Sequence, residues 1–128
     1  MATAINPNHT WDYVIEADRK EAPEKQTRFK LRALTPSQLA EVTDMGFEFQ
    51  LEKETKERTY RATPATQVLT TLRHGLVGWS NFKDASGKAV EVPDAAEGRV
   101  ALLSEDDRIE IAREIRFGGQ VTVEEGNS

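Results

Sequence analysis

The chain has 128 residues, a formal net charge of −5 and no cysteine. This length is enough for one domain with its own core, and the lack of cysteine excludes a disulfide framework, a thiolate nucleophile and a cysteine-bound metal. The acidic balance argues against general nucleic-acid binding, and the sequence shows no signal peptide and no apolar stretch near the ~20 residues of a membrane span. We expect a single acidic domain over 1–128, with a flexible arm at 1–10 and a tail at 124–128.

The first third of the chain predicts two strands. Alternation of apolar residues predicts one strand over 11–17 and a clearer one over 27–33. In the second strand Phe29 and Leu31 point to one face, and the cations alternate with them on the other. Those cations are Arg28, Lys30 and Arg32. They form either a ligand-facing stripe or cross-strand pairs with acids, and we favour the pairs because 47–53 alternates with its acids outward.

A short helix is expected between the strands 27–33 and 47–53. Thr35 and Gln38 form a capping box at its start, and Gly46 is expected to end it. The mixed-charge segment 52–61 that follows has too few apolar residues to be well buried, so we expect it to order on a partner. Its candidate partner-binding residues are Lys53, Lys56, Arg58 and Tyr60.

The stretch 63–92 organises the rest of the chain. Thr63 caps a predicted amphipathic helix, and we expect Gly75 or Gly78 to supply the left-handed residue that ends it.

A predicted hairpin follows this helix. It pairs 81–83 with 88–92 through a turn that has Gly87 at a positive-φ position. Trp79, Phe82 and Gly87 are the expected structural anchors of this unit.

The last quarter predicts a loop at 93–99 and a helix that runs from the Ser104 cap to about Arg116. The acids at 105–107 could suggest a metal site, but a helix start explains them better, because carboxylates in the first turn lie beside the positive end of the helix dipole. A short edge strand is predicted at 120–124.

These elements predict an α+β fold with a small, mostly antiparallel sheet, about three helices and a hairpin in the C-terminal half. The expected core side chains are Trp11, Phe29, Leu31, Leu39, Phe49, Leu69, Leu72, Leu76, Trp79, Ile111 and Ile115.

No combination of residues points to catalysis, a cofactor or a metal, so we expect no enzyme activity. His74 follows Arg73, one residue before Gly75, and is expected to be a surface or helix-end residue and not a catalyst. The charge is uneven: 104–128 holds seven acids and three arginines, net −4, and 18–32 holds six bases and three acids, net +3. Such polarity suits head-to-tail contacts between copies or a charged partner, although we favour the simpler interpretation of a solvated surface.

The segment 72–90, LRHGLVGWSNFKDASGKAV, resembles a pattern found in small proteins of tailed bacteriophages. In these an apolar helix runs into GLxGW, a turn containing aspartate and glycine, and an apolar strand. The front half, 18–19 with 26–35, looks like the beginning of the same proteins. The pattern is also similar to that of phage tail assembly chaperones, which are α-rich, act in the host cytoplasm and coat the tape-measure protein. Unlike those chaperones, this chain predicts a front sheet.

The resemblance implies an assembly factor, most directly for tails, that acts in the host cytoplasm by binding other phage proteins or further copies of itself. The alternative is a structural component of the head, neck or tail that stays in the virion. A small inhibitor or regulator of host proteins is a third hypothesis. None of the three implies a nucleic acid, a membrane or a small-molecule substrate as partner.

Overall fold

The computed structural model describes residues 1–4, 6, 8–55 and 65–118, and side chains throughout these ranges except 46–55. Three antiparallel strands form one sheet in the order β1-β2-β3. The strands are β1 (Thr10–Tyr13), β2 (Arg28–Arg32) and β3 (Leu76–Ser80). The helices are α1 (Pro36–Thr55), α2 (Ala65–Gly75), α3 (Ala96–Ala101) and α4 (Glu105–Phe117), with short 3-10 turns η1 (Glu16–Asp18) and η2 (Pro23–Lys25). The predicted α+β class is confirmed.

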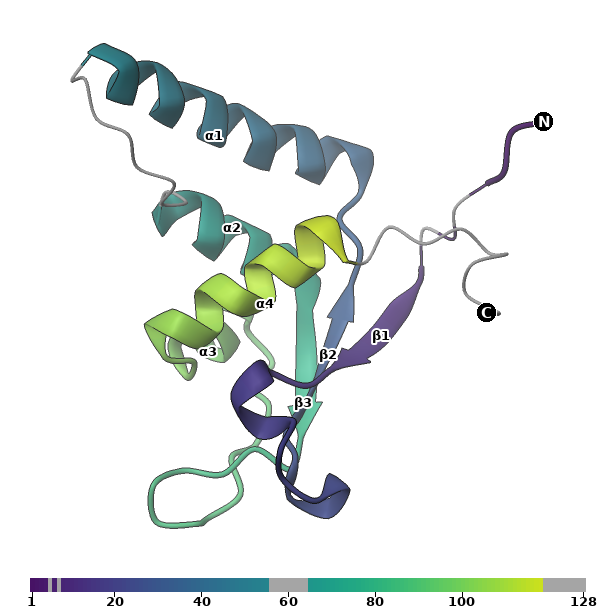
Figure 1. Cartoon of the computed structure of the whole chain (residues 1–128), viewed down its shortest axis with the longest axis vertical. Helices are drawn as coiled ribbons and strands as arrows, with labels where there is room; N and C mark the ends of the chain where they lie inside the picture. Colours follow the sequence, from purple (N-terminus) through teal and green to yellow (C-terminus); the bar gives the residue numbers. More distant parts are fainter. Residues whose placement is uncertain (5, 7, 56–64, 119–128) are drawn as a thin grey trace.

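The helices gather on one side of the sheet. Figure 1 shows α2, α3 and α4 beside the strands, with α1 alongside α2 and away from the sheet. Apolar side chains of the alternating strands meet those of α2 and α4 between these layers. Fully buried there are Phe29, Leu31, Leu72, Leu76, Ile111 and Ile115, all predicted core residues. The predicted core residues Trp11, Leu69 and Trp79 pack against this cluster but are only partly buried.

The predicted strand 47–53 is wrong. The chain continues through Gly46 as the single helix α1, which begins with the predicted capping box at Thr35. A glycine inside a helix costs only about 1 kcal/mol, and the Glu, Gln and Lys residues after it are good helix formers. Alternation over so few residues does not distinguish a strand from one side of a helix.

Helix α2 ends at Gly75, one of the two glycines expected there, but neither Gly75 nor Gly78 has the expected left-handed conformation. β3 begins directly after Gly75, so the Trp79 segment is a strand that the pattern did not reveal. Positive φ occurs, within the described residues, at Asn81 and at Gly87, where φ is 86° as predicted. Gly75 instead permits close packing, because a Cβ there would lie 2.5 Å from Cγ2 of Ile115 on α4.

The remaining elements differ in extent. The first strand ends at Tyr13, not residue 17, because the chain turns at Ile15 into η1. The predicted hairpin is reduced to one bridge, Lys83 with Ala89, and 93–99 contains the start of α3. The predicted final helix is confirmed as α4, whose Ser104 side chain accepts a hydrogen bond from the Asp107 N–H. The predicted strand 120–124 lies outside the described residues.

Candidate protein-binding surface

The face of the sheet turned away from the helices carries the three predicted cations of β2. We call Arg28, Lys30 and Arg32 the basic stripe. Lys30 is exposed and the two arginines are half-buried. Their cross-strand neighbours are small or polar: Ser80 and Gly78 on β3, and Asp12 and Thr10 on β1.

The predicted pairing of this stripe with acids of 47–53 is wrong, because that segment belongs to α1. Within the described residues no ion pair involves the stripe. Arg28 donates a hydrogen bond from Nη1 to the Pro23 carbonyl oxygen at 3.2 Å. Asp12 stands opposite Lys30 in the register of β1 and β2 and is the nearest cross-strand carboxylate. The stripe is therefore a positively charged strip on the sheet face turned away from the helices, exposed at Lys30 and half-buried at both arginines.

The other candidate partner-binding residues are not brought to this face by anything described. Lys53 lies in the last turns of α1, where side chains are outside the description. Lys56, Arg58 and Tyr60 lie outside the described residues altogether. Their role in binding stays a prediction.

Two of the predicted anchors, Trp79 and Phe82, lie together, whereas Gly87 lies apart at an exposed turn. Trp79 and Phe82 pack edge-on with centroids 5.1 Å apart, and each also packs against Phe29. The indole N–H of Trp79 donates to the Val90 carbonyl at 2.9 Å. This contact ties the loop that contains Gly87 to β3.

A second surface feature was not predicted: an open hollow of about 460 Å³ between β1, η1 and α4. Tyr13 donates its hydroxyl proton to Oε2 of Glu110 at 2.7 Å, and the Glu16 N–H donates to the same oxygen at 3.0 Å. Arg19 donates from Nη2 to the Tyr13 hydroxyl at 3.1 Å, and its guanidinium stacks over the ring. Tyr13 and Glu110 are 97 residues apart, so no local pattern could pair them.

Burial and negative charge shift the pKa values of two side chains that line this hollow, Tyr13 and Glu114. Burial, followed by the hydrogen bond to Glu110 and its charge, raises the pKa of Tyr13 to about 12. Burial also raises the pKa of Glu114, and repulsion from Glu110 adds to this while Arg19 opposes it. The hollow is thus a carboxylate-rich site that favours an added cation.

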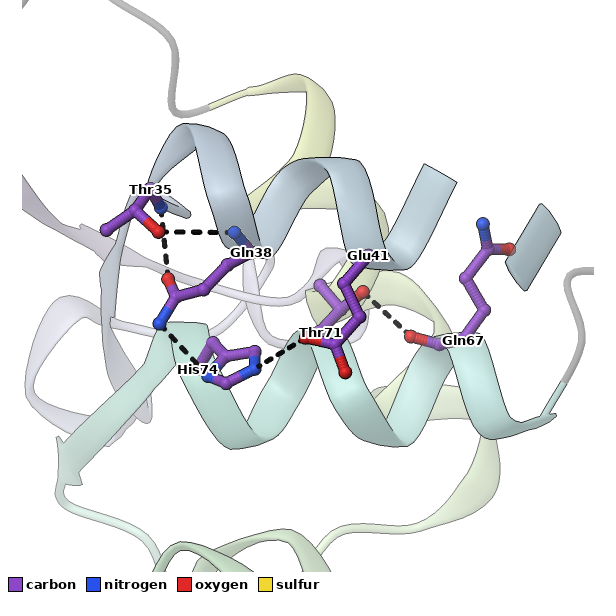
Figure 2. Close-up of polar contacts among 6 residues, drawn as sticks. All are labelled: Thr35, Gln38, Glu41, Gln67, Thr71 and His74. Atoms are coloured by element: carbon purple, nitrogen blue, oxygen red, sulfur yellow. Dashed lines mark hydrogen bonds and ion pairs between the residues drawn. The ribbon is translucent and has the colours of Figure 1, made fainter. Parts of the chain in front are cut away.

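Polar contacts join α1 to α2 (Figure 2). The Thr35 N–H donates to Oε1 of Gln38 at 3.0 Å, which orients the Gln38 amide so that its Nε2 lies 3.1 Å from Nδ1 of His74. On the other side of the ring, Nε2 of His74 lies 3.7 Å from Oε2 of Glu41. His74 at the end of α2 therefore lies beside a carboxylate of another helix, α1.

Buried amide and hydroxyl groups continue the same contact. Gln67 donates from Nε2 to the Val42 carbonyl at 2.8 Å, and the Thr71 hydroxyl donates to the Gln67 carbonyl at 2.8 Å. Both side chains are buried, but only the Gln67 bond crosses to α1, since the Thr71 bond lies within α2. We call the contacts of Gln38 and Glu41 with His74, and of Gln67 with the Val42 carbonyl, the α1–α2 polar seam.

A groove of about 140 Å³ also runs between α2 and α4, walled by Val68, Leu69 and Ile109. This volume is similar to that of one large side chain, whereas a helix is about 10 Å across. The groove can receive a side chain but not a partner helix.

No family model, curated protein or solved structure matches this chain. Within the described residues no group of three or more His, Asp or Glu side chains is placed to hold a metal. None of the helices described there has the length and apolarity to span a membrane. The two charged surfaces, the basic stripe and the carboxylate-rich hollow, are the features of the described residues that suit binding.

Proposed function

We propose that this protein is a bacteriophage assembly factor that works by protein–protein binding, most directly in tail assembly. The observation that carries the binding role is the basic stripe on the sheet face turned away from the helices, where Lys30 is exposed. The resemblance of 72–90 to small proteins of tailed phages supports the phage setting. The partners are other phage tail or structural proteins.

The stripe supports recognition by charge complementarity. Its cations are held in one row by the strand, so little conformational freedom of the backbone is lost on binding. Complementary charge accelerates encounter and selects partners more than it adds affinity, as suits contacts that must form and release during assembly. The narrow groove between α2 and α4 argues against capture of a whole helix there. A tail partner would therefore present an acidic surface to the sheet.

The test is co-expression with the tape-measure and tail proteins of the phage that encodes the chain. The wild type should co-purify with one of them, and Lys30→Glu/Arg32→Glu should reduce capture at least about tenfold, since each exposed ion pair contributes up to about 1 kcal/mol and reversal adds repulsion. The matched control is Lys83→Glu/Lys88→Glu, which reverses two exposed charges on the hairpin loop. Equal loss of capture in the control would remove the stripe from the proposal.

Mass spectrometry of purified virions separates this function from the second candidate, a structural component of head, neck or tail. An assembly factor is absent from the finished particle. Peptides in stoichiometric amount would replace the first function with the second. Capture of a host protein instead of any phage protein would favour a regulator of the host.

A further inference from the structure

The carboxylates that line the hollow beside α4 form a regular row. Asp106, Glu110 and Glu114 follow one another at four-residue spacing on α4 and all line the hollow. Four residues of α-helix rise about 6 Å, so the row is about 12 Å from end to end. We call these three residues the carboxylate row.

The basic stripe has nearly the same repeat. Arg28, Lys30 and Arg32 are alternate residues of a strand, and two residues of strand rise about 6.6 Å. The stripe is therefore about 13 Å long and carries one cation for each carboxylate of the row. The mismatch of about 1 Å is within the reach of long, flexible Lys and Arg side chains.

The two charged lines cannot meet within one molecule. α4 contributes Ile111 and Ile115 to the core on the covered face of the sheet, whereas the stripe lies on the opposite face. The sheet stands between them, because Phe29 and Leu31 of β2 pack into the same core as α4 and the stripe residues alternate with them on the other face. Only a stripe from another molecule can reach the row.

We propose that a second copy of this chain lays its basic stripe along the carboxylate row of the first, cation against carboxylate, in a head-to-tail contact. Glu110 can take part because the protein uses its Oε2 for Tyr13 and Glu16, and Oε1 is left for a cation. The apolar side chains of Ile109 and Phe117, the latter 71% exposed, offer a surface for the stems of Lys and Arg.

The charge balance of the hollow favours this occupant. Of the described residues that line it, four are carboxylates, the row and Glu16, and one is a cation, Arg113. Burial raises the pKa of Glu114, Arg19 opposes this rise and Glu110 adds to it, so a further cation beside Glu114 and Glu110 stabilises their charged forms. A contact between different surfaces of identical chains leaves one stripe and one row free, so it extends into a ring or filament instead of closing as a dimer.

The basic stripe is also the contact surface of the proposed function, so the proposed self-association rests on the proposed function to that extent. It is tested on the purified chain alone, without phage partners, so the two can fail separately. Each exposed ion pair strengthens association by no more than about fivefold, so the association is weak and salt-dependent. We expect the weight-average mass in sedimentation to rise with concentration at about 50 mM salt and to fall to that of a monomer at about 1 M, where charges are screened beyond about 3 Å.

Two single-surface variants make the experiment specific. Lys30→Glu/Arg32→Glu removes the stripe and Asp106→Lys/Glu114→Lys removes the row, and each variant alone should stay monomeric. Mixed together they should form a one-to-one complex, since the first keeps its row and the second its stripe. A chain that carries both pairs of substitutions has its charges exchanged and should self-associate again.

Matched controls reverse two exposed charges at other positions. Lys83→Glu/Lys88→Glu is the control for the stripe variant. Glu91→Lys/Asp94→Lys is the control for the row variant. These should associate as the wild type does. Far-ultraviolet circular dichroism confirms that every variant is folded.

A wild type that stays monomeric at low salt, a mixture that forms no complex, or controls that lose association equally would overturn the proposal. So would a monomeric wild type that associates once truncated after Gly118, because the acidic C-terminal residues of the same chain would then occupy the stripe.

Discussion

The close approach of α2 to α4 at Gly75 gives the sharpest prediction about stability. A methyl group at Gly75 would lie 2.5 Å from Cγ2 and 2.7 Å from Cδ1 of Ile115, which is 1% exposed and has no room to move away. Overpacking of a core costs about 1–3 kcal/mol, and Ala in place of Gly in a helix returns up to about 1 kcal/mol. Gly75→Ala should therefore destabilise the protein by about 1–2 kcal/mol and lower Tm by roughly 3–8 °C.

The assay is thermal and urea unfolding followed by circular dichroism, in a cycle with Ile115. In an Ile115→Ala background the obstructing atoms are gone, so Gly75→Ala should become neutral or stabilising. Ile115→Val is the matched control, because valine keeps a Cγ2 methyl group and relieves the clash only in part. The reasoning would be refuted by a Gly75→Ala variant as stable as the wild type, or by the same loss in the wild-type and Ile115→Ala backgrounds.

Three further predictions concern other parts of the fold. Gly87→Ala should cost about 1–2 kcal/mol in urea unfolding because φ is 86°, whereas Gly87→Asn should cost less. In a Tyr60→Phe chain, absorbance titration should show Tyr13 ionising near pH 12; since the unfolded tyrosine loses its proton near pH 10, this contribution to stability is present below pH 10 and lost as pH rises to 12. Glu110→Gln should shift that midpoint downward, and an unchanged midpoint would contradict the assigned hydrogen bond. Ser104→Ala should lower stability by about 1 kcal/mol through loss of the α4 cap, as measured by thermal unfolding, with exposed Ser86→Ala as the comparison.

Local signals predicted the elements whose causes are local. The capping box at Thr35, the cap at Ser104, the alternation of β2 and the turn at Gly87 each depend on residues within a few positions of one another. The structure confirms each of these four. They were sufficient to give the α+β class and about half of the expected core.

Two features that the sequence did not predict, β3 and the close packing at Gly75, depend on residues far away in the chain. β3 is a strand because β2 pairs with it, and Gly75 is required because Ile115 packs against it, 40 positions later. Neither partner is visible in the segment itself. The strand predicted over 47–53 failed for the opposite reason, since six alternating residues were given more weight than the helix propensity around Gly46.

The sequence predicted which residues form the basic stripe but not which residues surround them. The sequence placed Arg28, Lys30 and Arg32 on one face, and it assigned them the wrong neighbours because the position of 47–53 was wrong. The carboxylate row could have been found from its four-residue spacing. The hydrogen bond from Tyr13 to Glu110, which shapes the hollow, depends on tertiary contact alone.

The α1–α2 polar seam has a consequence for motion. Val42 is a fully buried apolar side chain of α1 that lies outside the main core cluster, and Gln67 of α2 donates to the Val42 carbonyl, which water can also satisfy. Among the side chains that the structure describes, separation of α1 thus exposes less apolar area than opening of the α2–α4 layer. Backbone amides of α1 should exchange with deuterium well before those of α4, and the first excursion from the native state is a swing of one helix away from an intact remainder.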